Sequence, residues 1–135
     1  MKEVSSSETV LFYDTDCGGV VSNIAYLRYV ERARCQLFEE LGLALAEMEE
    51  KAVFPAVTRS EIDYLSPGKL GDRVTTTARL VEVGKVRCVC EYKIHRSENE
   101  AEKTLLARAR QTVVLLQLPS GRPHRTPEAW RETPA

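Results

Sequence analysis

The chain has 135 residues, of which 43% are hydrophobic and 29% charged, and its formal net charge is -1 at pH 7. This length fits one domain around one hydrophobic core, so we expect a single domain over residues 1–135. Acidic and basic residues are mixed along the chain, which leaves no electrostatic footprint for DNA or RNA. No apolar run approaches the roughly 20 residues that span a bilayer, so neither a nucleic-acid partner nor membrane insertion is expected.

Cysteines and histidines give no pattern typical of a metal site. The chain contains four cysteines and two histidines: Cys17, Cys35, Cys88, Cys90, His95 and His124. Zinc needs about four well-placed ligands, so we expect no metal and no cofactor. Cys35, Cys88 and Cys90 are expected to be buried free thiols. The first residues carry charge without the apolar stretch of a signal peptide, so a cytoplasmic location is expected.

The predicted elements of the first half are a short strand and two helices. Residues 1–8 are expected to form a flexible arm, followed by a strand over residues 9–13. After a turn-rich segment, a long helix is predicted from about residue 23 to 41, because apolar residues recur every three or four positions. Ser22 or Asn23 can cap its start and Gly42 is placed to end it. A weaker helix is predicted over residues 43–51. The apolar stripe of the long helix is Leu27, Val30, Ala33, Leu37 and Leu41.

The second half is predicted to be mostly strand. A period-two alternation of buried and charged positions is clearest over residues 86–95. The remaining predicted strands cover residues 54–64, 74–83 and 104–118, with a polar hairpin loop over 96–103 and a tail over 119–135. Thr126 can cap a short helix in that tail, with Pro127 at its first position. Consecutive strands joined by short turns favour antiparallel pairing, which indicates an α+β domain: an antiparallel sheet of about five strands with one long helix to cover it.

The chemistry available to this chain rests on carboxylates and backbone donors. The sequence contains no GxSxG, no GxGxxG and no Gly-rich phosphate loop. Both histidines fall in polar surroundings and are expected to be solvated. By contrast, Asp14, Asp16, Gly18 and Gly19 come just before the long helix, whose unpaired N–H groups can stabilise charge on a carbonyl oxygen. A nearby carboxylate can attack that carbonyl or accept a proton from water. The plainer alternative is that the acids form Asx-turns and the glycines only turn the chain.

Residues 12–34 carry a resemblance to a known family. The run Asp-Thr-Asp-Cys-Gly-Gly-Val-Val at 14–21, followed by Asn23 to Leu27 and Glu-Arg-Ala-Arg at 31–34, resembles the active-site segment of the 4-hydroxybenzoyl-CoA thioesterase family. Within it, the chain is most similar to bacterial acyl-CoA thioesterases associated with the Tol–Pal cell-envelope system. Weaker matches at residues 62–67, 71–72 and 121–123 extend the resemblance over nearly the whole chain. It implies a hot-dog fold, hydrolysis of an acyl- or aryl-CoA thioester, and a homodimer or homotetramer with active sites at the dimer interface.

The resemblance also implies roles for particular residues. Asp16 matches the catalytic carboxylate, as nucleophile or general base, and the backbone N–H of Asn23 matches the donor that polarises the thioester carbonyl. Many relatives carry a histidine in place of Asn23. The residues expected to contact substrate are Gly19, Val20 and Tyr26 at the acyl group, with Lys85 and then Arg87 at the coenzyme A phosphates.

Several alternatives stay open at this point. Arg96, Arg108 and Arg110 are weaker candidates for the phosphates, and Lys85 is equally well explained as an exposed hairpin charge. Glu31 and Arg34 are expected to form a structural ion pair. A hot-dog dehydratase is disfavoured because it needs a well-placed histidine. A non-catalytic module that binds acyl-CoA or an acyl-carrier protein explains the fold without a need for Asp16.

Overall fold

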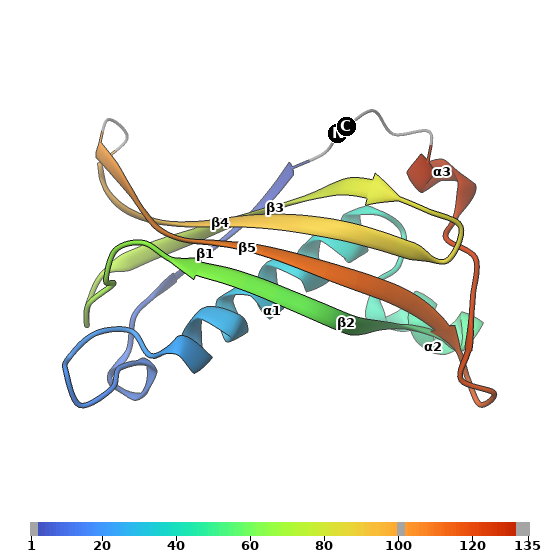
Figure 1. Ribbon diagram of the computed structural model, residues 1–135, viewed down its shortest axis with the longest axis horizontal. Helices are drawn as coiled ribbons and strands as arrows, with labels where there is room; N and C mark the ends of the chain where they lie inside the picture. Colours follow the sequence, from blue (N-terminus) through green and yellow to red (C-terminus); the bar gives the residue numbers. More distant parts are fainter. Residues whose placement is uncertain (1–2, 100–101, 132–135) are drawn as a thin grey trace.

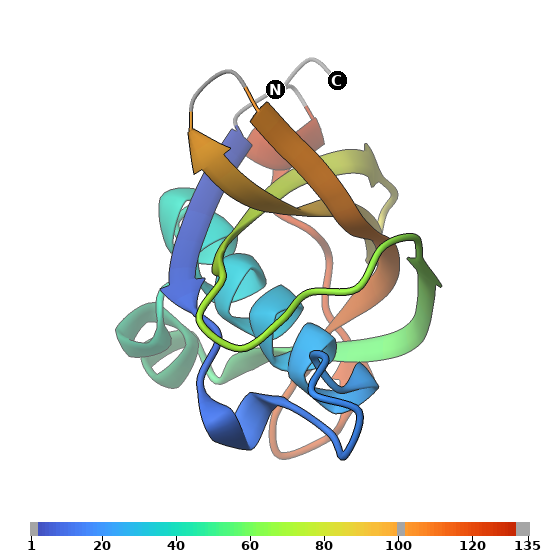
Figure 2. The ribbon, with the colours of Figure 1, turned by 90° about the vertical axis from the view of Figure 1, so that its left-hand side faces the viewer.

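The computed structural model describes residues 3–99 and 102–131 and forms one curled sheet with a long helix inside the curl (Figures 1 and 2). Within these residues the strands run in the order β1-β3-β4-β5-β2, with β6 paired to β5, and every pair is antiparallel. The predicted antiparallel sheet around one central helix is therefore confirmed, and the arrangement is the hot-dog fold. The elements are β1 (Glu3–Thr9), η1 (Phe12–Asp14, one turn of 3-10 helix), α1 (Asn23–Glu40), α2 (Leu45–Lys51), β2 (Val53–Tyr64), β3 (Arg73–Val83), β4 (Arg87–Asn99), β5 (Glu102–Gln117), β6 (Arg122–Pro123) and α3 (Glu128–Arg131).

Helix α1 begins and ends where the sequence predicts. Ser22 is the N-cap, because its Oγ accepts a hydrogen bond from the Ala25 N–H at 3.3 Å. Gly42 follows the last turn with φ at 87°, a conformation that glycine adopts without a steric penalty. The predicted apolar stripe is only partly right, because Leu27 is 38% exposed and Leu41 half-buried. Aromatic side chains complete the buried face, which comprises Ala25, Tyr26, Tyr29, Val30, Ala33, Arg34, Leu37 and Phe38.

The start of the chain is a strand rather than a flexible arm. Residues 3–9 form β1, which pairs with β3 along its whole length, from Glu3 opposite Arg79 to Thr9 opposite Arg73. The strand predicted over residues 9–13 is therefore wrong, since the chain there has already turned into η1. The sequence pattern did not predict this strand, because β1 consists largely of serines and one threonine. These residues pair through their backbones but give no alternation of apolar and polar positions. Of the predicted arm, only residues 1 and 2 lie outside the described residues.

Two further sequence expectations need correction. The polar loop predicted over residues 96–103 is mostly strand, since β4 runs to Asn99 and β5 starts at Glu102. Cys35 is exposed rather than buried, because it lies on the side of α1 opposite Ala33 and Leu37. Cys88 and Cys90 are buried as predicted.

The C-terminal tail closes one end of the curl. The predicted short helix is α3, where the buried Trp130 packs against Phe38 and donates from Nε1 to the Leu41 carbonyl at 2.9 Å. Thr126 was predicted to cap this helix, but it does not. Its hydroxyl instead donates to the Gly84 carbonyl at 2.6 Å, and its N–H donates to the Lys85 carbonyl at 2.8 Å. The tail thereby holds the turn between β3 and β4.

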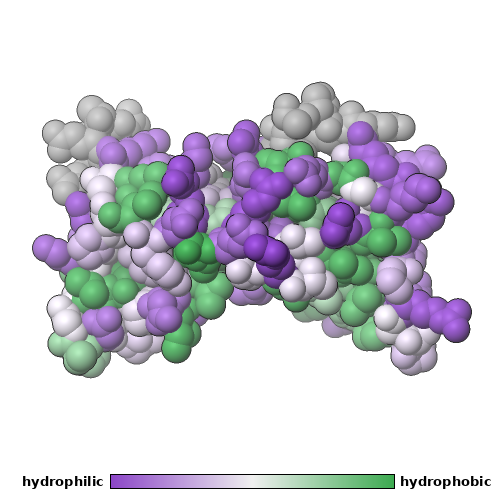
Figure 3. All heavy atoms as spheres, in the orientation of Figure 1, coloured by the Kyte–Doolittle hydropathy of each residue, from purple (hydrophilic) through white to green (hydrophobic). Residues whose placement is uncertain are grey.

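The outward face of the sheet is charged, and hydrophilic side chains gather across the middle of this face in Figure 3. Cross-strand ion pairs join Arg110 to Glu91 at 2.8 Å and Arg79 to Glu91 at 3.3 Å. Among the helices described, none combines the length and apolarity needed to cross a membrane. The apolar side chains lie instead between the inner face of the sheet and α1.

Candidate functional site

A pocket of about 330 Å³ opens where the start of α1 meets the chain between β2 and β3. Its walls are mostly apolar or aromatic. The residues that line it are Val20, Val21, Asn23, Tyr26, Tyr64, Leu65, Ser66 and Pro67. Three of the predicted site residues, Val20, Asn23 and Tyr26, are therefore brought together, whereas Asp16 and Gly19 lie in the adjacent loop.

The loop that carries Asp16 is a narrow hairpin. The Asp16 N–H donates to the Val20 carbonyl at 2.9 Å, and the Gly19 N–H returns to the Asp16 carbonyl at 3.0 Å. Gly19 has φ at 76°, which explains why a glycine occupies this turn. Asp16 Oδ1 accepts a hydrogen bond from the Gly18 N–H at 2.8 Å, so the Asx-turn named as the plainer alternative does form at Asp16. In the described part of the chain Oδ2 has no donor, so the exposed carboxylate keeps one oxygen available on a residue whose backbone bonds to Val20 of the pocket wall.

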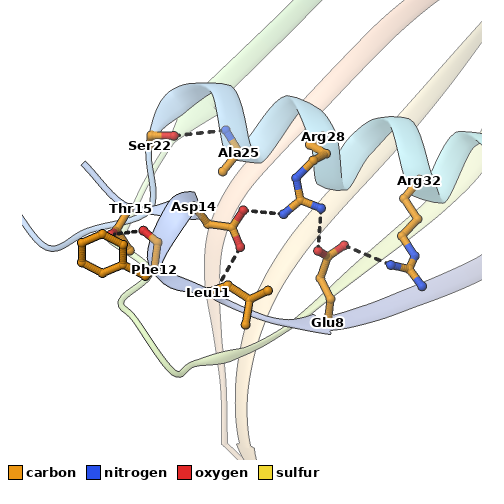
Figure 4. A network of polar contacts seen from close by, with 9 residues as sticks. All are labelled: Glu8, Leu11, Phe12, Asp14, Thr15, Ser22, Ala25, Arg28 and Arg32. Carbon is orange, nitrogen blue, oxygen red and sulfur yellow. Dashed lines mark hydrogen bonds and ion pairs between the residues drawn. The ribbon is translucent and has the colours of Figure 1, made fainter.

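Asp14 has a different role from Asp16. It is 2% exposed, and its Oδ2 accepts from the Leu11 N–H at 2.9 Å while its Oδ1 accepts from Arg28 at 2.5 Å (Figure 4). Arg28 also donates to Glu8 at 2.8 Å. Burial alone would lower the pKa of Arg28, but the hydrogen bonds to Asp14 and Glu8 outweigh it and raise the pKa above its ordinary value. Asp14 is thus engaged in joining η1 to α1, whereas Asp16 keeps a carboxylate oxygen that has no donor among the described residues.

The first turn of α1, where Asn23 lines the pocket, carries backbone donors without an acceptor in the described part of the chain. Ser22 N–H is already used, since it donates to the Asp14 carbonyl at 2.8 Å, and Ser22 Oγ caps Ala25. Within the described residues the N–H groups of Asn23 and Ile24 have no acceptor. They stand at the positive end of an 18-residue helix, where a partial negative charge is stabilised.

Tyr26 is both a core residue and part of the pocket wall. It is 4% exposed, its ring meets the Tyr64 ring at a centroid distance of 5.4 Å, and its hydroxyl accepts from the Gly68 N–H at 3.2 Å. Burial raises the pKa of Tyr26. Gly68 has to be a glycine, because a Cβ there would lie 2.9 Å from Val21. This opposite wall was not predicted, because residues 64–67 read as a strand end and a turn and the resemblance over residues 62–67 implied no role for them.

The predicted phosphate ligands lie away from this pocket in a single chain. Lys85 lies in the β3–β4 turn and Arg87 begins β4, at the opposite end of the sheet from the Asp16 loop (Figure 1). Among the weaker candidates, Arg110 is paired with Glu82 and Glu91. Arg96 donates to the Pro67 carbonyl at 3.3 Å, which places it behind the pocket wall. Arg108 lines a separate hollow on the outward face of the sheet.

The remaining side chains singled out by the sequence have no part in this pocket. His95 lies on β4, where burial lowers its pKa, and the exposed His124 has its Nδ1 2.8 Å from the Arg125 carbonyl. Glu31 and Arg34 form the predicted ion pair. The exposed Cys17 does not line the pocket. Within the described residues no three His, Cys, Asp or Glu side chains cluster to hold a metal ion.

Fold and site together define a hot-dog protein with the parts for acyl transfer, and known proteins agree with that class. Residues 10–133 match the family model of the thioesterase-like superfamily. The acyl-CoA thioester hydrolase YbgC of Escherichia coli O6:H1 is 26% identical over 120 residues, which are 89% of this chain and 87% of that protein. The acyl-CoA thioesterase YbgC of Helicobacter pylori is 37% identical over 91 residues, which are 67% of this chain and 65% of that protein. The chain therefore belongs to the thioesterase-like superfamily, and its enzyme class is that of the thioester hydrolases.

Solved structures agree on the fold. The 4-hydroxybenzoyl-CoA thioesterase from Pseudomonas superposes with a TM-score of 0.86 at 18% identity, covering 98% of this chain and 99% of that chain. A 1,4-dihydroxy-2-naphthoyl-CoA thioesterase from Synechocystis gives a TM-score of 0.82 at 24% identity, covering 96% and 93%. The resemblance to the 4-hydroxybenzoyl-CoA thioesterase family is confirmed, although identities this low establish the fold and not the substrate.

Proposed function

We propose that the protein hydrolyses an acyl- or aryl-CoA thioester to the free acid and coenzyme A. The observation that supports this most strongly is that one short segment carries both a free carboxylate oxygen, on Asp16, and N–H groups without an acceptor, at the start of α1. In sequence these groups lie before and after Val20, which lines the pocket. The pocket beside them is lined mainly by apolar and aromatic groups, which suits an acyl group. The relatives named as acyl-CoA thioesterases support the same substrate.

In this mechanism the helix start binds the thioester carbonyl oxygen. The Asn23 N–H donates to that oxygen, so negative charge that develops there during attack is stabilised. Asp16 then acts in one of two ways. As a nucleophile it forms a mixed anhydride and expels the coenzyme A thiolate, after which water cleaves the anhydride. As a general base it takes a proton from the water that attacks the carbonyl carbon.

We place the enzyme in a homodimer or homotetramer whose sheets join along β2. In one chain β2 is an edge strand, with residues 57–61 exposed, and an open edge of this length favours pairing. A two-fold axis beside β2 reverses the partner's sheet end for end. The partner's β3–β4 turn then lies at the same end as the pocket, which allows its basic side chains to contact the phosphates of coenzyme A. The free cysteines suit a reducing cytoplasm.

The direct test is a hydrolysis screen over short-chain, long-chain and aryl CoA esters and an acyl-carrier-protein ester, with thiol release as the readout. Turnover of at least one CoA ester is expected. If the wild-type protein binds these esters but releases no thiol from any of them, the function is that of a non-catalytic acyl-CoA or acyl-carrier-protein binding module.

Asn23→Ala is expected to leave kcat within several-fold of the wild-type value. The proposed donor is the backbone N–H, which alanine retains, and Ser22 rather than Asn23 supplies the helix cap. Steady-state kinetics on the best ester checks this, with Ser22→Ala as the comparison that costs about 1 kcal/mol of stability. A ~10²-fold loss of kcat in a stably folded Asn23→Ala protein would show that the side-chain amide takes part in catalysis.

Lys85→Ala is expected to raise KM about 10-fold with little change in kcat. A phosphate contact far from the thioester acts equally on ground and transition states, so its loss weakens binding alone. The measurement is KM at two salt concentrations, because salt should weaken wild-type binding more than mutant binding. Lys51→Ala, which removes an exposed lysine from α2, is the matched control. An unchanged KM would move the phosphate site away from the β3–β4 turn.

A further inference from the structure

A buried hydrogen-bond network links α1 to the edge strand β2. Its centre is Gln111, which lies in β5 and is 2% exposed. Gln111 Oε1 accepts from Arg34 Nη1 at 3.0 Å and from the Tyr92 hydroxyl at 2.8 Å, and Gln111 Nε2 reaches Ser60 Oγ at 3.0 Å. Arg34 is in turn held by its ion pair with Glu31. The network therefore ends at Ser60, an exposed residue.

The chemistry of the network fixes the role of the Ser60 hydroxyl. A guanidinium group has donors and no acceptor, so the atom of Gln111 that faces Arg34 must be the carbonyl oxygen. The amide nitrogen then faces Ser60, and Ser60 Oγ has to accept. Its own O–H remains free to donate, and no acceptor for it is found among the residues that the structure describes. Ser60 is thus held in place as a hydrogen-bond donor without a partner.

The position of Ser60 connects it to the pocket. Ser60, Ile62 and Tyr64 lie on the inner face of β2, because they pair with the buried residues Gln111, Ala109 and Ala107 of β5. Tyr64 lines the pocket. Helix α1 packs mainly against β1 and β3, and on this face of β2 Ser60 and Tyr64 remain exposed while Ile62 is half-buried. At about 3.3 Å per residue, the four residues from Tyr64 to Ser60 span ~13 Å.

We infer that Ser60 selects the acyl group, by donating a hydrogen bond to a neutral oxygen near the far end of a medium-length acyl chain. This rests on the proposed thioesterase function and names the substrate class for the same pocket. The acyl chain of the substrate would run from the thioester at the start of α1, past Tyr64 and Ile62, to Ser60. A neutral acceptor such as a hydroxyl is favoured over a carboxylate, because Glu31 already neutralises the charge of Arg34.

The test compares ω-hydroxydecanoyl-CoA with decanoyl-CoA. The wild-type enzyme should show a ~10-fold higher kcat/KM for the hydroxylated ester, the effect of one well-placed hydrogen bond. Ser60→Ala should remove this preference while leaving the decanoyl rate nearly unchanged. Ser60→Thr keeps the hydroxyl and should retain the preference. Thr58→Val removes a neighbouring exposed hydroxyl of β2, which donates to the Thr112 carbonyl, and should also retain it.

The outcomes separate this inference from the function on which it rests. An enzyme that hydrolyses both esters equally, or a preference that survives in Ser60→Ala, overturns the role of Ser60 and leaves the thioesterase intact. If Ser60→Ala weakens self-association in sedimentation while the ratio of the two esters is unaltered, the hydroxyl bonds to a second copy of the chain and the inference is wrong. Absence of hydrolysis with every ester overturns the proposed function and the selection together.

Discussion

Asp16→Asn is expected to fold as the wild-type protein does and to lose kcat by ~10²–10⁴. The amide keeps an oxygen that can accept from the Gly18 N–H, so the hairpin that holds residue 16 is preserved. An amide is neither a nucleophile toward a thioester nor a base for water, and both proposed roles of Asp16 are therefore lost. KM should change little, because the pocket walls are untouched. The measurement is steady-state thiol release on the best ester, with circular dichroism to confirm the fold.

Asp63→Asn is the matched control for this variant. Asp63 is also an exposed aspartate, but it lies on the outward face of β2, away from the pocket. It should retain wild-type kcat. A folded Asp16→Asn enzyme with near-normal turnover would remove Asp16 from the mechanism and leave the helix start as the only catalytic element. Burst kinetics and trapping with a nucleophile would then show whether any covalent intermediate forms.

The fold could be predicted where the sequence carries a strong period. The apolar spacing of α1, its cap at Ser22 and its stop at Gly42 place this helix within one residue of the observed bounds. The alternation around Cys88 and Cys90 places the start of β4 within one residue, although the strand runs on to Asn99, beyond the predicted end at residue 95. β1 escaped prediction because its serines pair through the backbone and bury little apolar surface.

The site could be predicted only where its residues are consecutive in the chain. The segment from Asp14 to Asn23 brings two acids and a helix start together through local turns, and the structure keeps them together. The opposite wall, Tyr64 to Pro67, reaches the pocket through the pairing of β2 with β5. Such a contact follows from sheet topology and not from spacing. The position of Lys85 relative to the pocket depends in addition on how two chains assemble.

Residue chemistry alone does not separate Asp14 from Asp16, since both acids precede the same helix, and only the family resemblance singles out Asp16. The structure separates them by burial and by partners, because Asp14 is 2% exposed and Asp16 is exposed. Asp14 accepts from the backbone of Leu11 and from Arg28, so one carboxylate joins η1 to α1. Removal of the Asp14 carboxylate should therefore lower stability directly, and it should lower catalysis indirectly, by loosening the loop that carries Asp16.

Asp14→Ala is expected to lower the free energy of unfolding by about 2–4 kcal/mol. The change leaves the Leu11 N–H without its acceptor and removes one of the two carboxylates that Arg28 contacts. Because Asp16 is only two residues further along, a loosened turn should also displace its carboxylate, and a shift of about 1 Å can cost ~10²-fold in rate. Urea unfolding and kcat, measured on the same preparation, check both parts.

A double-mutant cycle with Arg28→Met isolates the ion pair from the rest of the network. Arg28→Met keeps the aliphatic length of the side chain beside Tyr29 and leaves Asp14 bonded to the Leu11 N–H, so it should be milder than Asp14→Ala. In the background of Arg28→Met, the further change Asp14→Ala should cost less than it does in the wild type, since the pair is already lost. Arg32→Met, which removes only the longer 3.9 Å contact to Glu8, should change stability by less than about 0.5 kcal/mol. Equal stability of Asp14→Ala and the wild type, with kcat unaltered, would show that Asp14 does not anchor the loop that presents Asp16.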